Sequence, residues 1–161
     1  MLQEIFKNLI SFGYLGIFLI TLIGYSTIFF PLPVAIFVFS AAGFLNPWLL
    51  AVSAGLGSAF GEMTSYALGF GGRKLILKKE QIEKLEKITN ILKKKGTFFA
   101  IMFIAALPFF GGDLLGISAG FLKYDFKKFF LASFIGKTIL HLAISFAGFF
   151  GISWVRKVLL I

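Results

Sequence analysis

The chain has 161 residues, of which 58% are hydrophobic and 18% aromatic, and its mean hydropathy is +0.94. A soluble domain of this size has too little polar surface to cover so many apolar side chains, so the composition indicates an integral membrane protein with a single domain, residues 1–161. The net charge of +9 predicts anionic lipid rather than nucleic acid as the partner, because the basic residues lie beside apolar runs. With no cysteine and one histidine, the sequence predicts no disulfide, metal or other cofactor.

Three apolar runs are long enough to cross a bilayer as helices, since about 20 helical residues span the hydrocarbon core. The first covers residues 9–30, and we expect it to be retained because no small-residue cleavage site follows it. The second covers residues 48–72 and the third residues 129–155. These runs predict an all-α membrane protein.

Two further apolar segments are broken by proline, and we expect each to enter the membrane and return on the same side. Residues 31–47 begin with a Pro-Leu-Pro sequence and end at Asn46-Pro47, and residues 97–122 contain Pro108 followed by Gly111-Gly112. Proline lacks a backbone donor and bends or ends a helix, so neither segment has enough continuous helix to cross comfortably. A continuous span through Pro108 is the alternative.

A basic stretch, residues 73–95, lies between the second span and the second broken segment. Its apolar residues recur every three or four positions, and glutamates precede lysines by four, which is typical of an amphipathic helix on a membrane surface. With two re-entrant segments, thirteen Lys and Arg residues share the side of the N-terminus and this helix, against two at the C-terminus. That side is therefore predicted to be cytoplasmic, in the cytoplasmic membrane of a prokaryote.

An internal repeat relates the two halves. A shift of 77 residues superimposes Pro31 on Pro108 and the sequence AGFL at 42–45 on AGFL at 119–122; beyond the next turn, a shift of 79 aligns three glycines of the second and third spans. Each repeat is then a re-entrant helical hairpin plus a transmembrane helix, with an extra transmembrane helix at the N-terminus. The topology makes the repeats inverted, which is typical of secondary transporters.

Four ionisable residues interrupt the apolar segments: Glu62, Asp113, Lys137 and His141. Each is costly inside a bilayer unless it faces the protein interior, so the four predict a functional site. Lys137 and His141 share one helical face, as do Glu62 and Tyr66, because residues four apart lie above one another. The 79-residue shift aligns Glu62 with His141, so we expect the two polar faces to line one cavity.

Two interpretations of these residues require no transported molecule. Lys137 could pair with Glu62 or Asp113 as a structural ion pair, although desolvation cancels much of the attraction in such pairs. Asp113 follows a glycine pair and could cap the next helix, instead of binding a cation or proton. The sequence has no nucleophile with a base and no P-loop, so no enzyme is predicted.

Several short motifs follow one another along the chain. They are PLP at 31–33, G-E-x-x-x-Y-x-x-G at 61–69, GR at 72–73, GD at 112–113 and GK at 136–137. Together they resemble the DedA or VTT-domain family, and within it the shorter YqaA-like branch, over about residues 29–151. The resemblance implies opposed re-entrant helices and movement of lipids, polyprenyl phosphate or phospholipid, across a bilayer. It also implies that Glu62 and Asp113 are acidic groups of the cavity and that Arg73 lies near its cytoplasmic end.

We therefore expect a lipid transporter or scramblase for a phosphate-bearing lipid, with Lys137 attracting the phosphate and the carboxylates tuning charge or accepting protons. The alternatives are a proton-coupled exporter of small cations or drugs and a non-transporting scaffold that uses the 73–95 helix. The expected partners are anionic or phosphate-bearing membrane lipids, and a homo-oligomer stays open. The candidate site residues are Glu62, Tyr66, Arg73, Asp113, Lys137 and His141.

Overall fold

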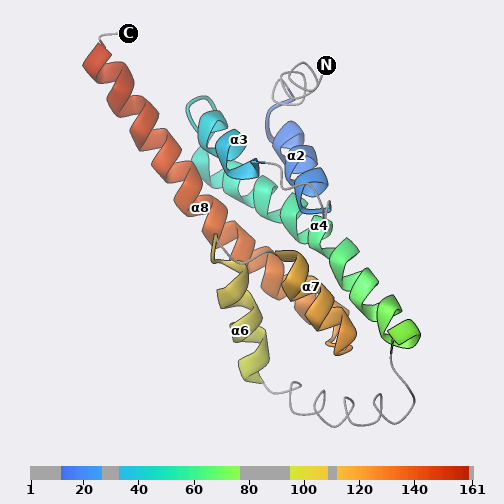
Figure 1. Ribbon diagram of the computed structural model, residues 1–161. Coiled ribbons are helices and arrows are strands. Elements are labelled where there is room, and N and C mark those ends of the chain that lie inside the picture. Colours follow the sequence, from blue (N-terminus) through green and yellow to red (C-terminus); the bar gives the residue numbers. More distant parts are fainter. Residues whose placement is uncertain (1–11, 27–32, 77–94, 109–111, 160–161) are drawn as a thin grey trace.

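The computed structural model describes residues 12–26, 33–76, 95–108 and 112–159, and within these ranges the chain is helical with no strand. The helices are α2 (Tyr14–Ser26), α3 (Val34–Ala41), α4 (Pro47–Ile76), α6 (Lys95–Ala105), α7 (Gly112–Phe121) and α8 (Phe126–Leu159) (Figure 1). The expectation of an all-α protein is therefore confirmed for the described part of the chain.

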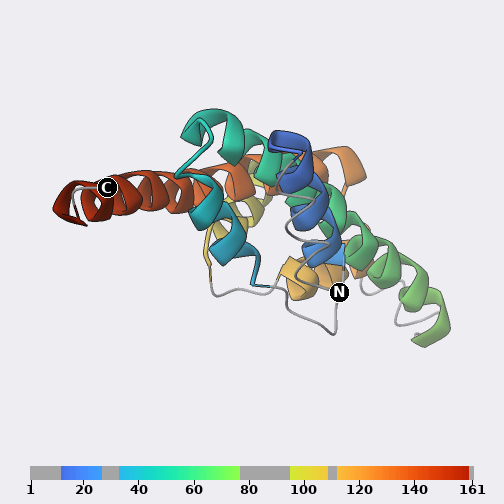
Figure 2. The same cartoon turned by 90° about the horizontal axis from the view of Figure 1, so that it is seen from above.

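The two long helices, α4 and α8, cross each other and form the frame of the molecule (Figure 1). Helix α2 packs along α4, and α6 packs along α8. Helix α3 contacts mainly α8, whereas α7 contacts mainly α4. The C-terminal ends of α4 and α8 project on opposite sides, as Figure 2 shows. Each long helix therefore supports two of the four short helices.

Polar and apolar side chains are distributed inside out compared with a soluble protein. Large apolar side chains cover the outer surface, and more than 60% of the side chain is exposed at Ile36, Phe44, Phe103, Leu114 and Trp154. In contrast, Glu62, Lys137 and His141 are buried. This distribution suits a molecule surrounded by lipid, where apolar groups gain nothing from burial and charges must face the interior.

Glycines let the short helices approach α4 closely. A Cβ atom at Gly57 would clash with the backbone of Phe18 in α2, and one at Gly69 would clash with the backbone of Ile117 in α7. Small residues allow such backbone contact, and the close packing that results contributes to helix association in membranes. The two glycines lie twelve residues apart, so α2 and α7 occupy successive parts of α4.

Helix α8 uses the same arrangement. A Cβ atom at Gly136 would clash with the backbone of Met102 in α6, and one at Gly148 would clash with the backbone of Phe39 in α3. These two glycines are also twelve residues apart. The 79-residue shift therefore aligns pairs of glycines that perform the same packing role on the two long helices.

Both long helices begin with a side-chain cap. The Asn46 Oδ1 accepts the backbone N–H of Trp48 at 3.0 Å, with Pro47 in the first helical position, where its missing N–H is not needed. The Asp125 Oδ1 accepts the backbone N–H of Lys128 at 2.8 Å at the start of α8. A 79-residue shift also aligns these caps.

Helix α4 covers the second predicted span and continues to Ile76, so the start of the segment expected as a surface helix, residues 73–95, belongs to α4. The glycines at 71 and 72 do not end the helix, because a helical glycine costs only about 1 kcal/mol. Residues 77–94 lie outside the described residues. Helix α8 extends beyond the third predicted span, residues 129–155, at both ends.

Among the described helices, α8 is the one long and apolar enough to cross a membrane, over Phe126–Trp154. Helix α4 has a similar length, but its glycines, its serines and Glu62 lower its hydropathy. Helix α2 has 13 residues, and the first predicted span, residues 9–30, lies only partly within the described residues.

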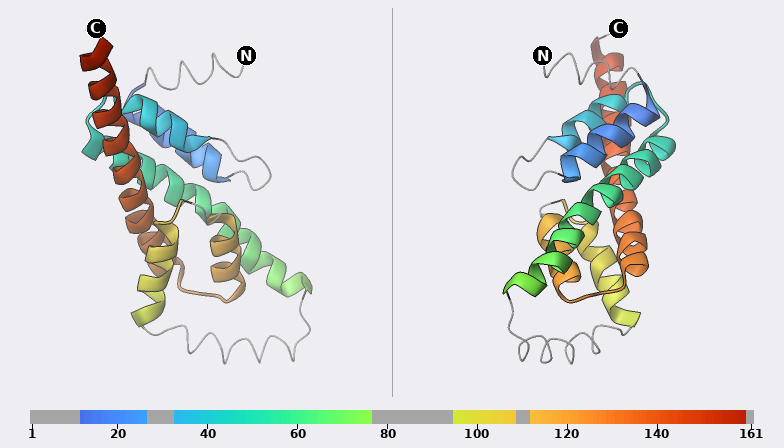
Figure 3. Two further views of the ribbon diagram at one scale, coloured as in Figure 1. Left: turned by 60° about the vertical axis from the view of Figure 1, so that its left-hand side comes forward. Right: turned by 90° about the vertical axis from the view of Figure 1, so that its right-hand side faces the viewer.

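The proline-broken segments form short helices joined to their neighbours by turns. Residues 34–41 form α3, and four residues of turn precede the Asn46 cap of α4. Residues 97–122 contain α6 and α7, which run in opposite directions (Figure 3) and are separated by a break at Pro108; residues 109–111 lie outside the described part. A continuous helix through Pro108 is therefore excluded.

Candidate functional site

A buried ion pair lies where α4 crosses α8. The Lys137 Nζ of α8 is 2.9 Å from the Glu62 Oε1 of α4, and 2% and 0% of the two side chains are exposed. A buried charge is strongly unfavourable without a partner, so each side chain compensates the other. Of the two partners that the sequence offered for Lys137, the structure selects Glu62.

Tyr25 of α2 covers the ammonium of this pair. The Lys137 Nζ lies 4.4 Å from the centroid of the Tyr25 ring, in the geometry of a cation–π interaction. The same ring meets the His141 imidazole at 6.2 Å between centroids and 87° between planes. Helix α2 therefore closes one side of the site with an aromatic ring that contacts both Lys137 and His141 of α8.

His141 forms the second polar contact between the long helices. Its Nε2 lies 2.9 Å from the Ser58 Oγ, and the same Oγ lies 2.7 Å from the Ala54 carbonyl oxygen. A hydroxyl has one hydrogen, which it donates to the carbonyl, so the Nε2–H must be the donor to Ser58. Neutral His141 is thus assigned, from its hydrogen bonds, the tautomer whose Nδ1 carries a lone pair.

Asp113 of α7 contacts α4 about one helical turn after Glu62. It is in the first turn of α7, and its Oδ1 accepts a hydrogen bond from the Ser65 Oγ at 2.8 Å. A negative charge is favourable at this end of a helix. The Asp113 side chain is half-buried and Ser65 is buried. Asp113 therefore combines the helix-start position expected from the sequence with a contact that joins α7 to α4.

Tyr66 lies apart from the ion pair although it is buried. Its hydroxyl donates to the Tyr124 carbonyl oxygen at 2.5 Å, and its ring stacks on Phe129 with 5.3 Å between centroids. These contacts place Tyr66 in an apolar cluster next to the turn between α7 and α8. Arg73 follows Glu62 by eleven residues on α4, which separates their backbones by about 16 Å along the helix axis.

Two residues of the site were missed by the sequence argument. Ser65 follows Glu62 by three positions, a spacing that places both on one helical face. This spacing could have indicated that Ser65 belongs to the polar site. Tyr25 follows Thr21 by four positions, and both are polar in an otherwise apolar run. That spacing could have indicated a polar face of α2 that includes Tyr25. The partners of Tyr25 could not be predicted, because they depend on how α2 packs on α4.

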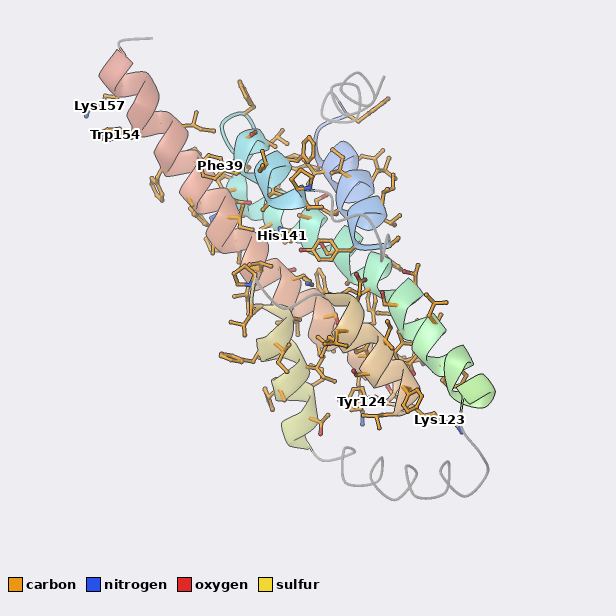
Figure 4. All side chains as sticks on the ribbon, in the orientation of Figure 1. Phe39, Lys123, Tyr124, His141, Trp154 and Lys157 are labelled. Atoms are coloured by element: carbon orange, nitrogen blue, oxygen red, sulfur yellow. The ribbon has the colours of Figure 1, made fainter. Side chains whose placement is uncertain are left out.

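The site lies in the middle of the molecule and combines charged and hydrogen-bonding groups with the Tyr25 ring. Figure 4 shows His141 near the middle of α8, between Lys123 at one end of the molecule and Lys157 at the other. The described residues contain no cluster of three or more histidines and carboxylates that could hold a metal. One ammonium, two carboxylates and a neutral imidazole can recognise charge and exchange hydrogen bonds.

The family model of the VTT domain matches residues 32–150. The chain is 31% identical over 144 residues to protein MJ0201 of Methanocaldococcus jannaschii, and the aligned region covers 86% of each of the two chains. It is 28% identical over 113 residues to the inner membrane protein YqaA of Escherichia coli and to that of Shigella flexneri, over 70% of this chain and 75% of each relative. No solved structure matches. Because the family model covers most of the chain, the chain belongs to the VTT-domain family of membrane proteins, as its motifs predicted.

Proposed function

We propose that this protein moves a phosphate-bearing lipid, a phospholipid or a polyprenyl phosphate, between the two leaflets of its membrane. The observation that carries the proposal is the Lys137 ammonium, which is held by Glu62 at the crossing of α4 and α8 in a fold covered by apolar side chains. Ionisable groups inside membrane proteins usually mark a pathway for a substrate or ion. An ammonium is a suitable ligand for a phosphate headgroup.

In this mechanism Glu62 keeps the empty site neutral and the phosphate competes with it for Lys137. The second carboxylate oxygen, Oε2, has no hydrogen-bond partner among the described residues, so the Glu62 carboxylate has capacity for a proton or another donor. Release of Lys137 from Glu62 would leave an unpaired buried carboxylate, which favours uptake of a proton. We therefore propose that headgroup binding and proton uptake at Glu62 accompany each other.

We also propose that the helices α2–α3–α4 and α6–α7–α8 are inverted repeats. Residues 97–122 would form one re-entrant hairpin from α6 and α7, and α3 of residues 31–47 would form the other together with α2. In each unit the first helix packs on its own long helix and the second packs on the other long helix. The 79-residue shift converts the Ser58–His141 contact into the Lys137–Glu62 contact, so the two polar contacts at the crossing are equivalents. Such a two-fold arrangement supports alternating access from either leaflet.

The distribution of basic residues supports an orientation with residues 73–95 in the cytoplasm. Tyr14, at the start of α2, then lies toward the opposite side, because its hydroxyl accepts the backbone N–H of Asn46 at the start of α4, whereas residue 73 is near the other end of that helix. In this orientation the turn between α7 and α8 also faces the cytoplasm, and the end of α8 that carries Trp154 faces the opposite side. The partner in this proposal is the lipid itself, and no covalent change of the lipid is involved.

The test is dithionite quenching of fluorescent phospholipid in liposomes that contain the purified protein. The wild type is expected to expose inner-leaflet lipid to the quencher, and Lys137→Ala is expected to slow this exposure strongly. Lys157→Ala is the matched control, because it removes the same charge from an exposed position of the same helix. Equal rates in both variants and the wild type would exclude the role of Lys137.

Quenching that stops at the outer leaflet even in the wild type would exclude general phospholipid movement. The same liposomes would then be tested with fluorescent polyprenyl phosphate. Movement of this lipid would narrow the proposal to a dedicated carrier, and no movement of either lipid would overturn it in favour of an ion-coupled exporter or a scaffold.

A further inference from the structure

One face of α8 carries a polar side chain at every turn across the site. The residues are Ser133, Lys137, His141 and Ser145, and each is no more than 1% exposed. The Oγ of Ser133, the Oγ of Ser145 and the Nδ1 of His141 have no hydrogen-bond partner among the described residues, and the same is true of the Oγ1 of Thr138. We call these five residues the α8 polar face.

The unpaired atoms are not explained by the helix itself. A serine in a helix can donate to the carbonyl four residues earlier, as Ser58 does to Ala54 at 2.7 Å. Ser133 and Ser145 do not make this bond within the described residues. Buried polar atoms of proteins nearly always have a partner, and where the protein supplies none the partner is ordered water. Four unpaired atoms on one face therefore indicate water along that face.

The tautomer of His141 shows which kind of partner its Nδ1 atom needs. Its Nε2–H is used by Ser58, so the Nδ1 lone pair needs a donor. Thr138 precedes His141 by three residues and Ser145 follows it by four, which places all three unpaired atoms on one helical face. A buried water needs two to four polar partners, and it can donate to an imidazole nitrogen while it exchanges hydrogen bonds with hydroxyls. The chemistry of the three groups fits water.

The α8 polar face is long compared with the membrane. Ser133 and Ser145 are twelve residues apart, which corresponds to about 18 Å along the helix. The hydrocarbon core is about 30 Å thick, so the row covers more than half of it. Lys137, with its Glu62 partner, lies between the two serines. Water along this face would therefore reach the ion pair from both directions.

We propose that a file of water molecules follows the α8 polar face on both sides of the Glu62–Lys137 pair. The ligand class is water and other small hydrophilic solutes that can donate to His141 and accept from the serines. This hydration offsets part of the desolvation of the two charges. The inference concerns the interior of the protein and does not depend on which molecule the protein moves.

Single-cysteine variants test the proposal, because the chain has no cysteine of its own. Ser133→Cys and Ser145→Cys replace one small polar group by a thiol, which reacts as a thiolate and therefore only where water reaches it. The purified variants would be treated in detergent with a small, positively charged methanethiosulfonate. Ala132→Cys, buried in an apolar cluster, and Ala143→Cys, exposed on the outer surface, are the matched controls.

Both serine-derived cysteines are expected to react at least about tenfold faster than both controls, since thiol reactivity follows exposure to water. Rates equal to those of the controls would overturn the proposal. Reaction at one of the two positions alone would also overturn it, because a pocket open at one end is not a file that passes the ion pair.

A second measurement needs no variant. The protein has one histidine, so labelling with ¹⁵N-histidine gives signals from His141 alone. NMR spectra that begin from water magnetisation are expected to show transfer to the imidazole of His141, and a lack of transfer would contradict the proposal. Neither measurement involves lipid. A protein that moves no lipid but shows both results would leave the water file intact and overturn only the proposed function.

Discussion

Lys137 and Glu62 form an ion pair at 2.9 Å between α4 and α8, and both side chains are buried in the interior of the molecule. Each charge occupies the interior only because the other is there, since one unpaired charge would be far more costly than the neutral pair. Tyr25 further shields the ammonium. The pair therefore connects the stability of the fold with the chemistry of the site.

The first prediction concerns this coupling. Lys137→Met and Glu62→Gln should each lower the stability by about 3–5 kcal/mol, because each leaves one buried charge without its partner. The double variant should lose clearly less than the sum of the two. Unfolding in detergent micelles, followed by circular dichroism, measures all three. Lys157→Met, on the exposed part of α8, is the control, and additive losses would contradict the coupling.

The second prediction concerns the packing of α7 on α4. In Gly69→Ala the added methyl group would clash with the backbone of Ile117, so we expect a loss of about 1–3 kcal/mol, as for other over-packed sites. Gly71→Ala is the matched control, because nothing lies within 4 Å of its new methyl group. That control should be as stable as the wild type or gain up to about 1 kcal/mol from helix propensity. Equal stability of the two variants would argue against this contact.

The third prediction separates Tyr66 from the ion pair. Tyr66→Phe removes the hydrogen bond to the Tyr124 carbonyl oxygen and should cost about 1 kcal/mol of stability. It should leave the lipid movement of the liposome assay unchanged, because the ring packs on Phe129 away from Lys137. Thermal unfolding and dithionite quenching test the two parts. A loss of lipid movement as large as that of Lys137→Ala would place Tyr66 in the pathway.

Much of the fold could be predicted because membrane helices are encoded by simple patterns. Long apolar runs predicted α4 and α8, and proline predicted the break between α6 and α7. The predicted end of α4 was wrong. The second span was predicted to end at residue 72, with a separate surface helix from residue 73, yet α4 continues to Ile76. A backbone near lipid must satisfy its own hydrogen bonds, and this favours a helix even where glycine would end one in water.

The candidate site could be predicted only in part, because helical spacing gives the face of a residue and not its partner. The spacing placed Lys137 and His141 on one face and aligned them with the polar positions of α4. It could not choose between Glu62 and Asp113 for Lys137, since that depends on where the two long helices cross. The roles of Tyr25 and Ser65 depend on the packing of α2 and α7, which no spacing within one helix encodes.

The last prediction concerns the tautomer of His141. Ser58→Ala removes the acceptor of the Nε2–H, so the imidazole no longer gains from keeping its proton on that nitrogen. With water beside Nδ1, we expect the variant to populate both neutral tautomers, whereas the wild type holds one. Nitrogen chemical shifts of the single labelled histidine distinguish these states. Ser53→Ala is the control, because Ser53 lies on the same helix but donates to the Tyr14 carbonyl oxygen. Identical spectra for Ser58→Ala and the wild type would mean that Ser58 does not fix the tautomer.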